Sequence, residues 1–215
     1  METNRKLPSE ALVYVVDDDA SICSSLSSLL RSEGIQVRTF TSPEDFLNSE
    51  MPDVPSCLIL DVRLQGASGL TLQQETIRER IRLPIIFLTA HGDIAMSVQA
   101  MKAGAFDFLT KPFRDQDMLD TVAAALKKNC ELRSQERLFA NIQSCYETLT
   151  PREKEVVSFV VEGLMNKQIA DRMGLSEVTV KIHRSQAMRK MDSRSVPDLV
   201  RKLQRVTTRD QGTSK

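Results

Sequence analysis

The sequence predicts an α/β domain with a doubly wound, five-stranded parallel sheet over residues 1–128, followed by an all-α domain of four helices over residues 148–205. In the first part, short and continuously apolar runs alternate with helical periodicity, which is typical of parallel strands covered on both faces. In the second part, a glycine-containing turn separates two short helical stretches, which is the pattern of a helix-turn-helix unit. The sign of the charge changes as well. Residues 1–128 carry 13 Lys and Arg against 18 Asp and Glu, whereas residues 148–215 carry 14 against 8, so the second part is the one suited to a polyanion.

The elements of the first domain are expected from alternating strand and helix signals. Each strand is a short apolar run that ends at a polar residue, and glycines mark several of the boundaries between elements. The expected strands are residues 12–16, 35–40, 56–61, 84–89 and 107–110, and the expected helices are residues 20–33, 43–49, 70–80, 94–103 and 114–128.

The segment 129–147 contains neither proline nor glycine, so it is expected to be a helical linker, with a flexible tether as the alternative. The second domain then opens with Thr150-Pro151-Arg152-Glu153, a capping box with proline at the first helical position. The first helix of this domain is expected to end at Glu162-Gly163. The next three are expected to run from Asn166 to Met173, from Ser176 to about Met191, and from Val196 to Leu203. Residues 206–215 are expected to be a disordered tail.

Composition excludes several classes of protein. The chain has 215 residues, of which 41% are hydrophobic, and no apolar stretch approaches the roughly 18–20 residues of a membrane span. The N-terminal residues lack the apolar core of a signal peptide, so a cytoplasmic protein without membrane contact is expected. The four cysteines are widely and irregularly spaced, which favours neither a zinc site nor a disulfide framework; they are Cys23, Cys57, Cys130 and Cys145.

Polar residues at the ends of the expected strands point to a reaction. Asp17, Asp18 and Asp61 each follow or end a buried strand, and the carboxyl ends of parallel strands meet at one edge of the sheet. Any one such Asp is most simply a helix cap, but clustered carboxylates repel one another unless a cation such as Mg²⁺ binds them. A carboxylate beside Mg²⁺, the hydroxyl of Thr89 and the ammonium of Lys111 is a constellation suited to phosphoryl transfer.

Residues 12–128 resemble the receiver domain of two-component response regulators. The resemblance rests on Val15-Val16-Asp17-Asp18-Asp19, Leu60-Asp61-Val62-Arg63, Leu88-Thr89-Ala90-His91-Gly92-Asp93 and Lys111-Pro112-Phe113, together with Ala100-Met101-Lys102-Ala103-Gly104-Ala105. It implies a flavodoxin-like fold with strand order 2-1-3-4-5 and a cis peptide bond before Pro112.

The same resemblance assigns roles to individual residues. It implies that Asp61 accepts the phosphoryl group and that Asp18, Asp61 and the backbone carbonyl of Arg63 hold Mg²⁺, with Asp17 acting largely through a water molecule. Thr89 and Lys111 would contact the phosphoryl oxygens, and Phe108 would change rotamer on activation. One departure is Gln65, which stands where receivers usually have proline; the missing φ constraint puts the lifetime of the phosphorylated state in question.

Residues 148–204 are similar to the LuxR-type DNA-binding domain, and the whole chain resembles FixJ-like regulators. The matching stretches are Leu149-Thr150-Pro151-Arg152-Glu153, Gly163-Leu164-Met165-Asn166-Lys167-Gln168-Ile169-Ala170 and Thr179-Val180-Lys181-Ile182-His183-Arg184.

The helix that begins at Ser176 is expected to have two faces. Helical spacing turns Val180, Ala187 and Met191 inward and places Lys181, Ser185 and Arg189 outward with Ile182 beside them, and the N-terminal half of this outer face would read base edges in the major groove. Lys181 is expected to contact a guanine or a phosphate, Ile182 a thymine methyl group, and Ser185 a base edge or a bridging water. His183 is expected either to pack between helices or to contact the DNA backbone. The candidates for phosphate contacts are Asn166, Lys167, Thr179, Arg184, Arg189 and Lys190.

Together these features predict a transcriptional regulator whose DNA binding is controlled by phosphorylation of Asp61. The expected partners are a sensor histidine kinase, double-stranded promoter DNA, RNA polymerase and a second copy of the chain. A phosphohydrolase acting on a small substrate would need a second acid or base and a pocket, and no insertion supplies one. The alternative is a DNA-binding regulator whose receiver dimerises without phosphorylation.

Overall fold

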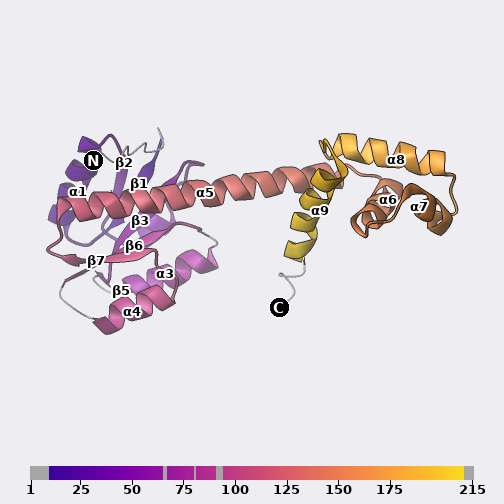
Figure 1. Ribbon diagram of the computed structural model, residues 1–215. Helices are drawn as coiled ribbons and strands as arrows, with labels where there is room; N and C mark the ends of the chain where they lie inside the picture. The colour runs from indigo at the N-terminus through magenta and orange to yellow at the C-terminus, as the bar shows by residue number, and fades with distance from the viewer. Residues whose placement is uncertain (1–9, 65–66, 80, 91–93, 211–215) are drawn as a thin grey trace. The chain divides into compact units, whose positions relative to one another are not determined.

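The computed structural model describes residues 10–64, 67–79, 81–90 and 94–210, so Gln65 lies outside the described residues. The chain divides into two compact units, residues 1–133 and residues 134–215, which we describe separately (Figure 1). Among the described helices, none has both the length and the apolar character needed to cross a membrane.

The first unit is built on a parallel sheet of five strands in the order β2-β1-β3-β6-β7. This order confirms the predicted fold class. A short antiparallel pair, β4 (Arg63–Leu64) and β5 (Ala67–Ser68), follows β3 and was not predicted. The strands of the main sheet are β1 (Leu12–Val16), β2 (Gln36–Phe40), β3 (Ser56–Asp61), β6 (Ile85–Ala90) and β7 (Asp107–Lys111).

Helices cover both faces of this sheet, because the strands are apolar on both sides (Figure 1). Val13 and Val15 of β1 pack with α1 and α5, whereas Tyr14 packs on the opposite face with residues of α2, α3 and α4. The helices are α1 (Ala20–Ser32), α2 (Pro43–Leu47), α3 (Gly69–Arg78), α4 (Ile94–Lys102) and α5 (Asp115–Glu147).

Gly69 allows α3 to begin directly against the end of β3. A Cβ atom at this position would lie 2.3 Å from the backbone oxygen of Asp61 and 3.2 Å from the ring of Phe87. The amide of Gly69 also donates a 3.0 Å hydrogen bond to the carbonyl of Val62. Any larger residue would displace the backbone that carries Asp61.

Helix α5 contains 33 residues and runs without interruption through the predicted linker. Its residue Asn129 is buried in the first unit, where Oδ1 accepts a 2.9 Å hydrogen bond from Ser56 N and Nδ2 donates a 3.1 Å bond to the carbonyl of Arg82. One turn later, Arg133 forms an ion pair with Asp53. The packing of the first unit therefore extends past residue 128, where the sequence placed its end.

The second unit consists of the end of α5 followed by α6 (Pro151–Val161), α7 (Asn166–Met173), α8 (Glu177–Lys190) and α9 (Val196–Asp210). Thr150 and Glu153 form the predicted capping box. Gly174 ends α7 with φ of 65°, a left-handed conformation that glycine adopts without strain. Helix α9 continues to Asp210 and so includes residues 206–210 of the segment that was expected to be a disordered tail. The core contains Ile142, Val156, Val160, Ile169, Val180, Ala187, Leu199 and Leu203.

Candidate functional site

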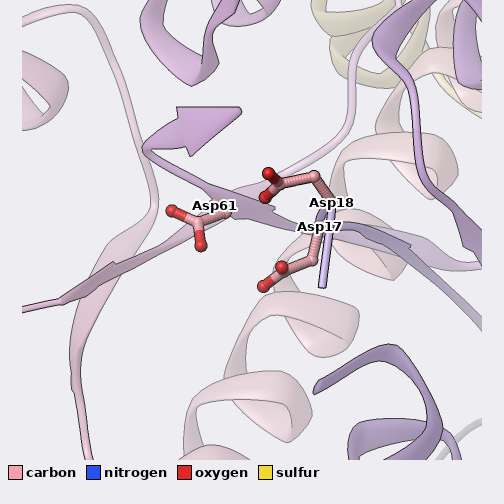
Figure 2. A group of neighbouring side chains, drawn as sticks. All are labelled: Asp17, Asp18 and Asp61. Carbon is pink, nitrogen blue, oxygen red and sulfur yellow. The ribbon is translucent and has the colours of Figure 1, made fainter. Parts of the chain in front are cut away.

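Three carboxylates gather at the carboxyl edge of the sheet. Asp17 and Asp18 follow β1, and Asp61 ends the neighbouring strand β3. One carboxylate oxygen from each residue lies within 4.8 Å of the other two. Figure 2 shows the three side chains gathered together. Asp17 is 1% exposed and Asp61 is 8% exposed, so little solvent screens the repulsion between them.

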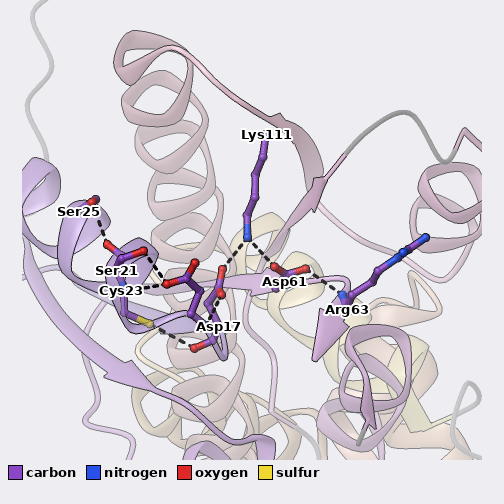
Figure 3. Close-up of polar contacts among 8 residues, drawn as sticks. Asp17, Ser21, Cys23, Ser25, Asp61, Arg63 and Lys111 are labelled. Carbon is purple, nitrogen blue, oxygen red and sulfur yellow. Dashed lines mark hydrogen bonds and ion pairs between the residues drawn. The ribbon is translucent and has the colours of Figure 1, made fainter. Parts of the chain in front are cut away.

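Lys111 supplies the positive charge beside this cluster. From the end of β7, its Nζ donates hydrogen bonds of 2.8 Å to Asp17 Oδ2 and 2.5 Å to Asp61 Oδ2 (Figure 3). Burial favours the neutral amine, but the hydrogen bonds to Asp17 and Asp61 outweigh burial and raise the pKa of Lys111. Burial also raises the pKa of the Asp17 carboxyl, although the hydrogen bonds from Lys111 and the Asp19 amide act against it. Lys111 is therefore a stable ammonium at neutral pH.

The backbone fixes the orientation of both buried carboxylates. Asp17 Oδ1 accepts a 2.9 Å hydrogen bond from the amide of Asp19, and Asp61 Oδ1 accepts a 2.8 Å bond from the amide of Arg63 (Figure 3). In each carboxylate the other oxygen faces Lys111. Asp19 itself caps α1, since its Oδ1 accepts a 2.8 Å bond from the amide of Ser21.

The strand register brings Thr89 to the same edge. Strand β6 lies between the strands of Asp61 and Lys111, with Leu88 opposite Asp61 and Ala90 opposite Lys111. Thr89 stands between these two pairs and is buried. Phe108, on β7, is 38% exposed, so its ring is not locked into the core. The peptide bond before Pro112 is cis, as the resemblance implied.

The three carboxylates suit a divalent cation with a preference for oxygen ligands. Asp17, Asp18 and Asp61 each offer one oxygen to a common point, and Mg²⁺ commonly binds to proteins through a few carboxylates while keeping several waters. The three carboxylates carry three negative charges against the one positive charge of Lys111, and such an ion would offset the difference. The edge of the sheet thus combines a buried carboxylate, an acidic cluster that could hold a cation and a fixed ammonium, which are groups that phosphoryl transfer uses.

In the second unit, α8 has the two faces that its spacing predicted. Val180, Ala187 and Met191 are buried, whereas Lys181, Ser185 and Arg189 are exposed. Ile182 is 51% exposed. The sequence did not single out Val178, which is 65% exposed; its position four residues before Ile182 is the signal that places both on one face.

Several predicted phosphate contacts are engaged inside the unit. Arg184 Nη1 donates a 2.8 Å hydrogen bond to Asn166 Oδ1, which links α8 to α7. Lys190 Nζ donates bonds of 2.7 Å to Glu153 Oε2 and 3.2 Å to the carbonyl of Thr148. Lys190 therefore joins α8 to the start of α6, and its contact with a DNA phosphate stays a prediction.

His183 is half-buried, and its Nδ1 atom is buried without a hydrogen-bond partner among the described residues. Both expected roles of His183, packing between helices and contact with the DNA backbone, stay predictions. Lys167, Lys181 and Arg189 remain exposed at the surface of the unit.

Comparisons with known proteins identify both units. The response regulator receiver domain family matches residues 13–123, and the luxR family of bacterial regulatory proteins matches residues 147–203. Nodulation protein W of Bradyrhizobium diazoefficiens is 54% identical over 192 residues, which cover 89% of this chain and 85% of that protein. The chain is a two-component response regulator of the FixJ/NarL family.

Solved structures support this membership. The response regulator StyR is 44% identical, with a TM-score of 0.83 over 91% of this chain and 98% of that one. Full-length FixJ from B. japonicum is 33% identical, with a TM-score of 0.56 over 94% and 99% of the two chains. This response regulator is a transcriptional regulator, and its relatives are regulators and not enzymes, as the sequence predicted. Its receiver domain implies a sensor kinase as a partner, and its LuxR-type domain implies DNA.

Proposed function

We propose that this response regulator accepts a phosphoryl group on Asp61 from a sensor histidine kinase in the cytoplasm, and that the modification controls binding of promoter DNA. The observation that carries the proposal is the 2.5 Å contact between Lys111 Nζ and Asp61 Oδ2 beside Asp17 and Asp18. A lysine held against a strand-end carboxylate in an acidic cluster prepares that carboxylate to become an acyl phosphate.

The transfer is a displacement at phosphorus. One oxygen of Asp61 attacks the phosphorus of a phosphohistidine, the P–O bond forms as the P–N bond breaks, and the departing imidazole nitrogen takes up a proton. Oδ1 is held by the amide of Arg63, so Oδ2, which faces Lys111, is the attacking atom. Lys111 then moves its hydrogen bond from Asp61 to an oxygen of the transferred group, and Thr89 donates its hydroxyl to another.

Asp17, Asp18 and Asp61, with the backbone carbonyl of Arg63, would hold Mg²⁺, with Asp17 acting largely through a water molecule. The bound ion would neutralise charge on the phosphoryl oxygens. Asp17 and Asp61 remain aligned for this task because backbone amides hold one oxygen of each.

The output of the switch is the assembly of two DNA-binding domains. When Thr89 and Lys111 turn toward the phosphoryl group, Phe108 changes rotamer and the receiver surface favours pairing with a second copy. Two copies of α8 then bind half-sites about one turn of DNA apart. Bound at a promoter, the dimer contacts RNA polymerase.

Phosphorylation is tested by incubating the full chain with acetyl phosphate and Mg²⁺ and measuring a mass increase that hydroxylamine removes. Wild type should be modified once, and Asp61→Asn should not be modified. Asp45→Asn, at an exposed position of α2, is the matched control and should react like wild type. Full labelling of Asp61→Asn would contradict the assignment.

Gating is tested by comparing DNA binding of wild type and Asp61→Asn, each with and without acetyl phosphate. We expect the phosphodonor to tighten binding and promote dimerisation of wild type alone. If both proteins bind and dimerise equally under all conditions, the receiver is a dimerisation module that works without phosphorylation, the alternative that the sequence left open.

A further inference from the structure

The outer face of α8 carries an apolar pair that the folding of the domain does not explain. Val178 is 65% exposed and Ile182 is 51% exposed, one helical turn apart. At 3.6 residues per turn, both lie with Ser185 and Arg189 in a stripe about 60° wide. This stripe lies nearly opposite the buried residues Val180 and Ala187.

Helix stability gives no reason for valine at this position. Val178 is the second residue of α8, which Ser176 already caps, since its Oγ accepts a 3.1 Å hydrogen bond from the amide of Thr179. A β-branched side chain lowers helix propensity relative to alanine, and the exposed Val178 recovers little of that cost through burial. A single exposed apolar residue would be ordinary, but two adjacent ones on one face form a surface that water solvates poorly.

The charges around the pair indicate what covers it. Lys181 is exposed beside the stripe and Arg189 is exposed within it, and the pair lies in the first half of α8. In helix-turn-helix proteins the N-terminal residues of the second helix contact base edges. Among these edges, the 5-methyl group of thymine is the apolar feature of the major groove.

We infer that Val178 is a base-reading residue, and that Val178 and Ile182 together recognise two thymine methyl groups in each half-site. This inference rests on the proposed DNA-binding function and specifies the sequence that it selects. The two side chains are four residues apart, a rise of about 6 Å along the helix. Base pairs stack at about 3.4 Å, so the two methyl groups should lie about two base steps apart.

The test starts from DNA sites that the phosphorylated full chain selects from a random pool. In a selected site, each thymine is replaced singly by deoxyuridine, which lacks only the 5-methyl group. At two positions about two base steps apart, replacement of thymine should reduce the affinity of the protein for the site about fourfold, which is what burial of one methyl group is worth. Val178→Ala should abolish the loss at one of these positions, and Ile182→Ala should abolish it at the other.

Two controls separate recognition from folding. The exposed position of Val178 means that Val178→Ala should keep the wild-type circular dichroism spectrum. Val161→Ala changes an exposed valine on α6 and should keep both deoxyuridine sensitivities. If Val178→Ala shows the same sensitivities as wild type, the inference is wrong while the proposed function stands. If phosphorylated wild type selects no sequence at all, both fail.

Discussion

Replacing Asp61 with asparagine should leave the stability of the first unit nearly unchanged without Mg²⁺ and should abolish its stabilisation by Mg²⁺. The substitution removes the repulsion of Asp61 by Asp17 and by Asp18 and also its attraction to Lys111. Asparagine is close in size to aspartate, and its oxygen can still accept the hydrogen bond from the amide of Arg63.

The magnitude follows from the distances. At an effective dielectric constant of about 20, charges 4.8 Å apart interact by about 3.5 kcal/mol, and each of the two repulsions is at least this large. The attraction across 2.5 Å to Lys111 is about 6.6 kcal/mol on the same scale. The opposing contributions nearly cancel, and relief from burying the Asp61 charge favours the variant. We expect the free energy of unfolding to change by no more than about 1 kcal/mol.

The effect of Mg²⁺ on stability should distinguish wild type from Asp61→Asn. At a concentration one hundred times its Kd, a ligand that binds only the folded state stabilises it by about 2.7 kcal/mol. Wild type should gain this amount and Asp61→Asn should gain much less. Hydrogen exchange of the slowest amides in β1 and β3 measures the free energy of opening for this unit alone.

Lys111→Met provides the contrast, because it removes both attractions and leaves all three carboxylates. Without Mg²⁺, the free energy of unfolding of Lys111→Met should be about 3–5 kcal/mol lower than that of wild type, and Mg²⁺ should restore part of this difference. A drop of more than about 2 kcal/mol for Asp61→Asn without Mg²⁺ would refute the balance of charges. Equal stabilisation of Asp61→Asn and wild type by Mg²⁺ would show that Asp61 is not a ligand.

Three other predictions concern single side chains. Burial alone would raise the pKa of Glu153, but the hydrogen bonds from Lys190 and Thr150 outweigh burial and lower this pKa. The stability that Glu153 contributes is therefore fully present above its unfolded pKa of about 4.3. It is lost as the pH falls through the lower pKa of the folded state. Glu153→Gln should reduce the acid sensitivity of the second unit, measured by hydrogen exchange in α6 and α8, and an unchanged pH profile would contradict this role. Arg189→Ala should reduce the slope of log affinity against log salt by about 0.9 if Arg189 contacts one phosphate, and an unchanged slope would remove it from the interface. Tyr14 has a buried hydroxyl without a hydrogen-bond partner among the described residues, so Tyr14→Phe should be neutral or stabilise the first unit by up to about 1 kcal/mol; a loss of more than 1 kcal/mol in urea unfolding would reveal a bond to ordered water.

The polar cluster at the sheet edge could be predicted because its residues directly follow the strands in the sequence. A buried parallel strand must end where polar residues begin, and the carboxyl ends of such strands share one edge. The positions of Asp17, Asp61 and Lys111 at the strand ends therefore implied the cluster before any contact was known. The capping box could also be predicted, because Thr150 and Glu153 lie within one helical turn of each other.

Partnerships between distant residues could not be predicted in this way. Lys190 and Glu153 are separated by 37 positions, and an exposed helical lysine looks the same in sequence whether it contacts DNA, solvent or a buried carboxylate. Arg184 and Asn166 pair across two helices for the same reason. Periodicity gives the face on which a charge lies, but the neighbour of that face depends on how the helices pack.

Asn129 shows that sequence similarity to a family and the physical limit of a domain are different boundaries. The receiver family match ends at residue 123, yet Asn129 accepts a hydrogen bond from Ser56 N and donates one to the carbonyl of Arg82. A receiver fragment cut at residue 123 would leave both backbone groups without these partners, at a cost of about 1–3 kcal/mol for each one that stays buried. A fragment cut after Arg133 would keep them, so receivers trimmed to their family limits can lose stability that the intact protein has.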